Sequence, residues 1–454
     1  MSSALPSRLD RRLYNGLQRF LDVQAQEVRA VFWSFSYFFA LLCSYYIIRP
    51  MRDEMGIAGG VENLQWLFSG TFVAMLAAVP LFGWVSSRFP RRRFLPWLYM
   101  FFIINLLVFF VLFRSDVTHA WVARAFFIWV SIFNLFVVSV FWSFMADLFN
   151  NEQAKRLFGF IAAGGTVGAL VGPVLTTALA IPLGPTNLLL VSACFLLWAV
   201  VCLKRLISSG TQRPDGGTVH TPVSADVEQA MGGSVFAGIQ LVLRSPYLLG
   251  ICVLMLLFTT LATFLYFQQA QIIRDHFTDP AARTAVFAAM DLAVNTLTIV
   301  IQVFVTGRLV KWLGLAVTLA LIPLLLAAGF ALLGCAPVLA VLVVVQVMRR
   351  AGNYAIMRPA REMLYVVLGR EEKYKAKNFI DTVVYRAGDA VSAWVYTGLR
   401  ALGFSLGGIA WLAVPLAGLW AWLAYTLGKR QGVIAASAQA KPSSEASPQT
   451  TKLY

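Results

Sequence analysis

The stretch "AVFWSFSYFFALLCSYYIIRPM", residues 30–51, is an almost uninterrupted run of apolar side chains that closes on an arginine and a proline. A helix needs about 20 such residues to cross the ~30 Å hydrocarbon core of a bilayer. Similar runs recur along the 454-residue chain, which is 59% hydrophobic and 13% charged, with a mean hydropathy of +0.73. Soluble domains carry roughly 25% charged residues. The sequence therefore predicts an all-α polytopic membrane protein.

The apolar runs and the breaks between them predict about twelve spanning helices. A polar, glycine-rich segment separates six runs from six, so we expect two six-helix bundles, 30–203 and 247–428, joined by a cytoplasmic linker at 204–246. The predicted spans are 30–51, 64–84, 94–114, 121–146, 157–181, 185–203, 247–271, 283–306, 313–333, 337–358, 379–399 and 406–428.

Both ends of the chain lie outside the predicted spans. Leucines recur at helical spacing among arginines in residues 1–29, which predicts an amphipathic cytoplasmic helix on an anionic membrane surface and no removable signal peptide. A solvated helix with scattered leucines is the alternative interpretation. Residues 429–454 are small and polar, a composition typical of a disordered cytoplasmic tail.

The formal net charge of +16 is distributed in a way that predicts topology. Lysines and arginines gather in alternate loops, and short basic loops remain on the cytoplasmic side of a membrane. Both termini are therefore expected to be cytoplasmic. This pattern also explains the basic chain by topology and by contact with anionic membrane lipids, so the sequence does not favour nucleic acid as a partner.

The two halves of the sequence resemble each other. "MRDEMG" at 51–56 and "IIRDHF" at 272–277 each close the first span of a half, and "EQAKRLFGF" at 152–160 resembles "YKAKNFID" at 374–381. Both correspondences require an offset of about 220 residues, which favours a duplicated six-helix unit of the kind that transporters use for alternating access. We therefore expect two six-helix pseudo-repeats.

Two glycine-containing stretches resemble signatures of the major facilitator superfamily. "GWVSSRFPRRRF" at 83–94 is similar to the glycine-and-basic loop between its second and third helices, and "GGTVGALVGP" at 164–173 is similar to its antiporter motif. Gly164, Gly168 and Gly172 also share one helical face, so a structural role is the alternative: they would let two helices approach closely whatever is transported.

Three further stretches occur in order along most of the membrane region. They are "IIRPMRD" at 47–53, "FWSFMADLFNNEQAKRLFGF" at 141–160 and "AKNFIDTVVYRAGDA" at 376–390. Together they resemble the bacterial and plastid ATP/ADP translocase family, a divergent branch of the major facilitator fold. The resemblance implies a twelve-helix carrier of nucleotide-like anions in a bacterial inner membrane.

The same resemblance assigns roles to individual residues. Arg52 stands where the family has a substrate-binding lysine, and Asp147 stands where it has a functional acidic residue. Asp389 stands where the family has its second important lysine, which reverses the local field that a phosphate would meet. The uncharged Gln268 and Gln271 lie where an acidic residue of the seventh helix is expected. The substrate is therefore left wider than ATP and ADP.

Ionisable residues inside the predicted spans are the candidates for function. Each costs at least ~2.5–3.5 kcal/mol near the middle of a span, so it is normally paired or lines a water-filled cavity. One hypothesis places them around one central cavity, and the alternative is a set of permanent interhelical ion pairs. The predicted substrate-binding residues are Tyr46, Arg49, Arg52, Asp147, Gln268, Gln271, Arg349, Arg350 and Arg386. The predicted proton-coupling or gating residues are Asp291, Asp381 and Asp389.

Local features of two charged stretches need no function. Pro50 is expected to break or bend the end of the first helix, Arg49 and Asp53 are i,i+4 partners that would neutralise each other, and Glu54 is expected to meet water. The basic run around Arg361 is expected to be a solvated, lipid-facing loop.

These features favour a secondary active transporter that works by alternating access on a small organic anion, such as a nucleotide or a phosphorylated metabolite. Proton-coupled transport of another metabolite is the main alternative. A membrane-embedded enzyme is less favoured, because no grouping of nucleophile and base occurs. No phosphate-binding loop and no metal-ligand spacing is found, so we expect neither a cofactor nor a metal. The sequence does not fix an oligomeric state.

Overall fold

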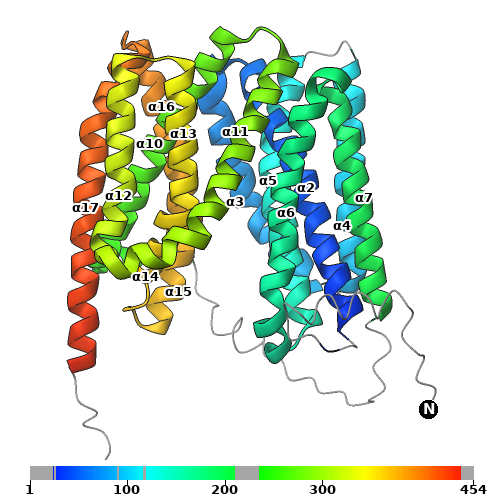
Figure 1. Ribbon diagram of the computed structural model, residues 1–454, viewed down its shortest axis with the longest axis horizontal. Helices are drawn as coiled ribbons and strands as arrows, with labels where there is room; N and C mark the ends of the chain where they lie inside the picture. The colour runs from blue at the N-terminus through cyan, green and yellow to red at the C-terminus, as the bar shows by residue number, and fades with distance from the viewer. Residues whose placement is uncertain (1–23, 25–26, 89–90, 116–118, 210–234, 441–454) are drawn as a thin grey trace, which may run out of the picture. The chain divides into compact units, whose positions relative to one another are not determined.

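The computed structural model describes residues 24, 27–88, 91–115, 119–209 and 235–440 (Figure 1). Every regular element within these ranges is a helix, as the sequence predicts. Most of the amphipathic helix expected at 1–29, residues 210–234 of the linker and residues 441–454 of the tail lie outside the described residues. The basic signature at 83–94 falls largely among side chains that are not described.

The helices form two compact units. Unit 1 comprises Met1–Thr221 and Tyr266–Thr296, and unit 2 comprises Pro222–Leu265 and Leu297–Tyr454. The sequence instead predicts a division at the linker, with all residues from 247 onward in the second bundle. Residues 266–296 group with unit 1 because their charged side chains pair with the first spanning helix, as described below.

Unit 1 is built around the first long helix. Its elements are α2 (Val28–Ala58), the short 3₁₀-helix η1 (Val61–Asn63), α3 (Leu64–Arg88), α4 (Arg91–Arg114), α5 (His119–Leu148), α6 (Asn151–Leu183), α7 (Pro185–Ser209), the second part of α10 (Pro246–His276) and most of α11 (Pro280–Ile301). Helix α2 packs against α5, α6 and α7. It also continues through Pro50, where the sequence predicts a break or bend at its end.

Unit 2 contains three π-helical segments set between α-helices. Its elements are α9 (Val235–Arg244), the first part of α10, η2 (Gln302–Thr306), α12 (Gly307–Cys335), α13 (Leu339–Gly352), η3 (Asn353–Met357), α14 (Arg358–Leu364), α15 (Arg370–Phe379), η4 (Ile380–Val384), α16 (Tyr385–Ala401) and α17 (Leu406–Ala440). The π-helices are η2, η3 and η4. Helices α12 and α17 lie side by side (Figure 1).

Ten helical stretches in the described ranges are long and apolar enough to cross a membrane. One of them, Pro280–Cys335, is 56 residues long, which at 1.5 Å per residue is ~84 Å and so contains two predicted spans. Gly314, whose φ is +73°, interrupts its helical geometry at the start of the second of these spans. The predicted span 379–399 is not among the ten, because Asp381, Arg386 and Asp389 make it too polar.

Two predicted boundaries are displaced. Helix α17 continues to Ala440, so residues 429–440 are helical rather than part of a disordered tail. Helix α7 continues to Ser209 and α9 forms at Val235–Arg244, so the linker predicted at 204–246 begins and ends in helix. In each case the polar residues that suggest a loop lie at the end of a helix, because the helix extends beyond its apolar residues.

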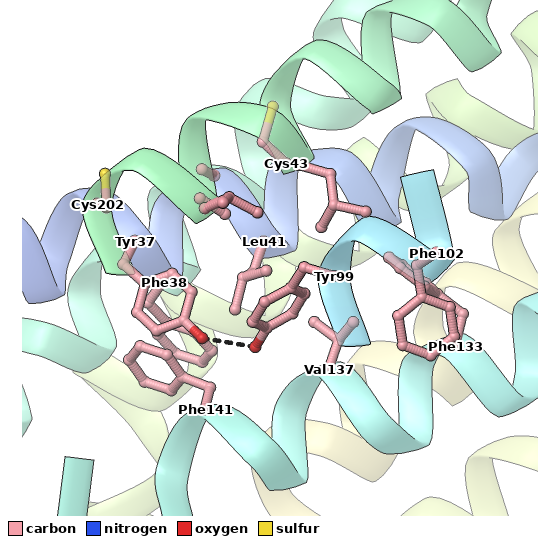
Figure 2. Packing of buried hydrophobic residues seen from close by; sticks show 14 of the residues in the cluster. Tyr37, Phe38, Leu41, Cys43, Tyr99, Phe102, Phe133, Val137, Phe141 and Cys202 are labelled. Carbon is pink, nitrogen blue, oxygen red and sulfur yellow. Dashed lines mark hydrogen bonds between the residues drawn. The ribbon is translucent and has the colours of Figure 1, made fainter. Parts of the chain in front are cut away.

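An aromatic core fixes α2 against α4 and α5 (Figure 2). The hydroxyl of Tyr37 donates a hydrogen bond to the hydroxyl of Tyr99 at 2.6 Å, and both side chains are fully buried. Phe38 stacks on Phe141 with ring centroids 4.1 Å apart and planes 8° from parallel. Such aromatic pairs contribute about 0.5–1.5 kcal/mol each beyond their burial. They hold α2 in the middle of unit 1.

The glycines of α6 let it approach α2 closely. A Cβ on Gly164 or Gly168 would collide with a backbone carbonyl of α2, and one on Gly168 would also lie 2.9 Å from the backbone nitrogen of Cys43. A Cβ on Gly172 would lie 2.7 Å from Cβ of Tyr46. No side chain larger than hydrogen fits at these three positions, so the packing role expected from their common face accounts for them.

A polar clamp joins the first turns of α2 and α6. The Glu27 carboxylate accepts hydrogen bonds from the backbone of Gln24 at 3.0 Å, from Gln153 Nε2 at 2.9 Å and from Arg156 Nη2 at 3.0 Å. Asn150 and Gln153 form a reciprocal capping box at the start of α6. Burial raises the pKa of Glu27, but these hydrogen bonds and the charge of Arg156 outweigh it, so its pKa lies below the usual value.

Substituting Gly168 by valine should destabilise the protein, because the added carbons meet the backbone of α2. The expected cost is at least the ~1–3 kcal/mol of an overpacked core. Gly159→Val is the matched control in the same helix, since a Cβ there meets nothing within 4 Å. Thermal unfolding of the purified proteins in detergent measures the difference, and equal midpoints for the two variants would contradict the packing role.

Glu27→Gln should lower the unfolding temperature at neutral pH. Because the folded pKa lies below the ordinary value of 4.5, the carboxylate contributes fully above that pH and loses its contribution as the pH falls through the folded value. The difference from the unsubstituted protein should therefore shrink on acidification, measured by thermal unfolding from pH 7 to about pH 3. Glu152→Gln is the control, since that side chain is 80% exposed. A difference that persists unchanged to the lowest pH would be inconsistent with the clamp.

Candidate functional site

Two ion pairs connect the charged end of α2 to α11, one with its arginine on α2 and the other with its arginine on α11. Arg49 Nη1 lies 3.4 Å from Asp291 Oδ1, and Arg283 Nη2 lies 2.8 Å from Glu54 Oε1. Both carboxylates are only 1% exposed, so each would be costly to bury without its arginine. The expectation that Glu54 meets water is wrong, because Arg283 reaches it from the first turns of α11.

Arg52 and Asp53 form a second polar group, which connects α2 to α5 and α10. Arg52 Nη1 lies 3.1 Å from Asp53 Oδ1, and Arg52 Nε donates to Ser131 Oγ at 3.1 Å. The Arg52 guanidinium lies 3.8 Å from the centre of the Phe127 ring, and the Tyr266 hydroxyl donates to Asp53 Oδ1 at 3.0 Å. Asp53 therefore contacts Arg52 and Tyr266, whereas the sequence predicts Arg49 as its i,i+4 partner.

The end of α10 contributes a third group. Arg274 Nη1 lies 2.6 Å from Glu62 Oε1 and its Nε lies 3.4 Å from Asp275, the same contact with the next residue that Arg52 makes in the corresponding motif. Gln271 Nε2 donates to Asp275 Oδ2 at 3.1 Å. Gln268, one turn earlier, is buried in unit 1. Of the two predicted glutamines, Gln271 therefore contacts a carboxylate of its own helix.

Asp147 lies far from the arginines of α2. The contact of Arg52 with α5 is at Ser131, which is ~24 Å from Asp147 along the helix axis. Asp147 is exposed in the last turn of α5. Arg52 and Asp147 are therefore not neighbours within unit 1, and a common cavity for them stays a prediction. Tyr46, by contrast, lies beside an arginine, with its ring centre 5.6 Å from the guanidinium carbon of Arg49.

Unit 2 carries a group of arginines on α13 and α16, which we call the arginine cluster: Arg349, Arg350 and Arg386, with Asp389. Arg349 Nε donates to Gln346 Oε1 at 3.0 Å, and Arg350 is 8% exposed. Arg386 Nη1 lies 3.6 Å from Asp389 Oδ2. Arg350 and Asp389 lie close enough to Arg349 for their charges to act on it, which brings α13 near α16.

A separate set of ion pairs joins α14 to the segment before α16. Arg361 Nη2 lies 3.3 Å from Asp381 Oδ1 in η4, and Lys377 Nζ lies 2.6 Å from Glu362 Oε2. Arg361 Nη1 also contacts the sulfur of Met255 on α10 at 3.3 Å. The expectation of a solvated loop around Arg361 is wrong, because these partners leave its side chain only 12% exposed.

The described groups differ in the charged side chains that they bring together. On α2 and α11 the arginines Arg49, Arg52 and Arg283 meet the carboxylates Asp53, Glu54 and Asp291. In unit 2, Arg361 and Lys377 meet Asp381 and Glu362. The arginine cluster brings together three arginines, one of which pairs with Asp389. Guanidinium groups gathered in this way attract an anion.

Two functional candidates were missed from the sequence for identifiable reasons. Arg283 is the first residue of the predicted span 283–306, so its charge is expected at the end of the span, where it needs no partner such as Glu54. Arg361 was assigned to the water-exposed loop by the charge of its neighbours. The available signal was the cost of an isolated charge in a spanning helix, which requires a partner for Glu54 and for Asp381.

The fold and these buried charges define a polytopic membrane transporter. The chain belongs to the major facilitator superfamily, whose model matches residues 30–364. This family consists of transporters, so the chain is a transporter and not an enzyme.

Two curated relatives are named ADP,ATP carrier protein 1. The protein from Chlamydia muridarum is 22% identical over 494 aligned residues, covering 94% of this chain and 92% of the relative. The protein from Chlamydia trachomatis is 23% identical over 358 residues, covering 70% of this chain and 66% of the relative. They confirm the resemblance to the ATP/ADP translocase family that the three quoted stretches predict.

Solved structures share the fold at low sequence identity. A bacterial homologue of the iron transporter ferroportin, in an inward-facing state, has a TM-score of 0.65 at 11% identity, covering 89% of this chain and 99% of that chain. The peptide-transporter-family protein PepTSo has a TM-score of 0.59 at 14% identity, covering 91% and 99%. At these identities the likeness establishes the fold alone.

Replacing Arg283 by methionine should destabilise the protein by about 3–5 kcal/mol, because Glu54 is then buried without its cation. The double variant Glu54→Leu with Arg283→Met should recover most of this loss, since both charges leave together. A double-mutant cycle of thermal unfolding midpoints measures the coupling. Additive effects of the two substitutions would show that the pair does not interact.

Proposed function

We propose that the chain carries an organic anion of about two or more negative charges, such as a nucleotide or a phosphorylated metabolite, by alternating access. The observation that supports this proposal is the arginine cluster. Arg349 and the buried Arg350 lie on α13, and Arg386 lies on α16 beside Asp389. An anion among partly buried arginines is attracted more strongly than in water.

The chemistry of the cluster favours a phosphate group. Guanidinium groups present fixed forks of N–H donors that match the geometry of phosphate oxygens, and charge-assisted hydrogen bonds of this kind are about twice as strong as neutral ones. Asp389 would orient Arg386 and set a lower limit on the charge of the ligand, because a weakly charged anion cannot compete with it. The names of the two curated relatives support a nucleotide.

The remaining predicted residues receive roles that fit their contacts. We assign Arg49, Arg52 and Asp291 to a gate, because their partners join α2 to α5 and α11. Asp381 and Asp389 are candidates for proton coupling, since protonation of either would release an arginine. We further propose that the protein resides in a bacterial inner membrane with both termini cytoplasmic, and that Gln268 and Asp147 act at a distance from the anion.

Proton-coupled transport of another anionic metabolite is the second candidate. It is favoured by the contact of Asp389 with Arg386, because a proton on this carboxylate would raise the positive charge of the cluster without any other change. The two candidates place the substrate at the same residues and differ in the coupling ion and in the ligand.

Reconstitution into proteoliposomes loaded with ADP tests both candidates. Arg349→Gln and Arg386→Gln should each reduce uptake of labelled ATP by about 10- to 100-fold, the size expected for one charge-assisted contact with phosphate. Arg308→Gln is the matched control, since that arginine is exposed on α12 of the same unit. Its uptake should remain unchanged.

Failure of exchange by the unsubstituted protein would reject the nucleotide, and uptake of another anion driven by a proton gradient would then support the second candidate. Unimpaired transport by both arginine variants would reject the arginine cluster as the binding site for either ligand.

A further inference from the structure

The helical run that carries two arginines of the cluster is interrupted directly after them. Helix α13 ends at Gly352, two residues beyond Arg350, and the π-helix η3 (Asn353–Met357) leads into α14. A π-turn holds one more residue than an α-helical turn, and such segments occur frequently at functional sites. The point at which α13 ends therefore sets the direction in which Arg349 and Arg350 leave the helix.

Pro359 explains why backbone carbonyls at the interruption need hydrogen-bond donors from outside the helix. In an α-helix the carbonyl of Ala355 would accept from the N–H of residue 359, but proline has none. The N–H of Arg358 is donated to Asn353, five residues earlier, instead of to Tyr354. Two successive carbonyls, those of Tyr354 and Ala355, thus lose the donors that an unbroken helix would supply.

Both carbonyls receive side-chain donors from η2, the π-helix between α11 and α12. Thr306 Oγ1 donates to the carbonyl of Ala355 at 2.8 Å, and Gln302 Nε2 donates to the carbonyl of Tyr354 at 3.5 Å. Ala355 is fully buried, where an unsatisfied carbonyl would be costly. Side chains of η2 therefore donate to backbone carbonyls of η3, although the two π-turns are far apart in the sequence.

We propose that Thr306 and Gln302 are positioning residues of the anion site. Their side chains replace the N–H that Pro359 lacks, keep the π-turn at Asn353–Met357, and so hold Arg349 and Arg350 in the orientation that binds the anion. This inference rests on the proposed function of the arginine cluster. Neither residue touches the anion, and their effect is exerted through the backbone of η3.

The test measures binding of inorganic pyrophosphate to the purified full-length protein, from the concentration dependence of its thermal stabilisation. Thr306→Val should weaken this binding about tenfold, the size expected for one buried hydrogen bond, and Thr306→Ser should restore it. Gln302→Met, on an exposed side chain, should weaken it less. Thr318→Val is the matched control, because that buried hydroxyl on α12 donates to Gly314, away from η3.

Pro359→Ala provides an independent measurement, since it returns a backbone donor to the carbonyl of Ala355. In that background the hydroxyl of Thr306 is redundant, so Thr306→Val should reduce pyrophosphate affinity by less than about threefold. An equal loss in both backgrounds would overturn the proposal. If Thr306→Val fails to fold alone but folds with Pro359→Ala, the donor replacement is supported directly.

Arg349→Gln and Arg350→Gln separate this proposal from the function on which it rests. If they abolish pyrophosphate binding while Thr306→Val and Gln302→Met leave it intact, the positioning role is wrong and the anion site stands. If the arginine variants bind pyrophosphate as well as the unsubstituted protein does, the anion site itself is wrong. Loss in Thr306→Val with rescue by serine, and with Thr318→Val unchanged, is the result expected.

Discussion

A charged side chain inside a membrane-spanning helix must find a partner, and this requirement organises both units. Helix α2 carries four charged side chains within two turns, and the helices that supply their partners belong to unit 1. Asp291 and Arg283 of α11 form ion pairs with Arg49 and Glu54, respectively. The Tyr266 hydroxyl of α10 donates a hydrogen bond to Asp53. The compact unit therefore includes residues that follow the linker, because the cost of isolated charges exceeds any preference for neighbours in sequence.

Close packing makes these contacts available. The glycine face of α6 and the aromatic core around Tyr37 fix α2 over most of its length, so its charged end is presented from a rigid helix. Unit 2 uses a different arrangement, in which π-turns break the helices that carry charge. The arginine cluster lies beside two such breaks, η3 and η4.

Apolar periodicity predicted the helices well, because crossing a bilayer constrains length and composition together. It failed where polar residues belong to helix ends, as in the extension of α17 to Ala440. Charge inside a predicted span singled out Asp291 and Arg349 but not their partners, since pairing depends on which helices pack. The role of Thr306 cannot be predicted from the sequence. Pro359 predicts a broken helix, but only the fold shows that the Thr306 hydroxyl lies 2.8 Å from the carbonyl of Ala355.

The charge of the bound anion tests the role of the arginine cluster most directly. Adenosine monophosphate and the methyl ester of its phosphate share base and sugar but differ by about one negative charge at neutral pH. Equilibrium titration of the purified protein should give a Kd for the dianion at least about tenfold lower than for the ester, with the gap closing in Arg349→Gln. Equal Kd values for the two ligands, or binding of neither, would contradict an anion site built from these arginines.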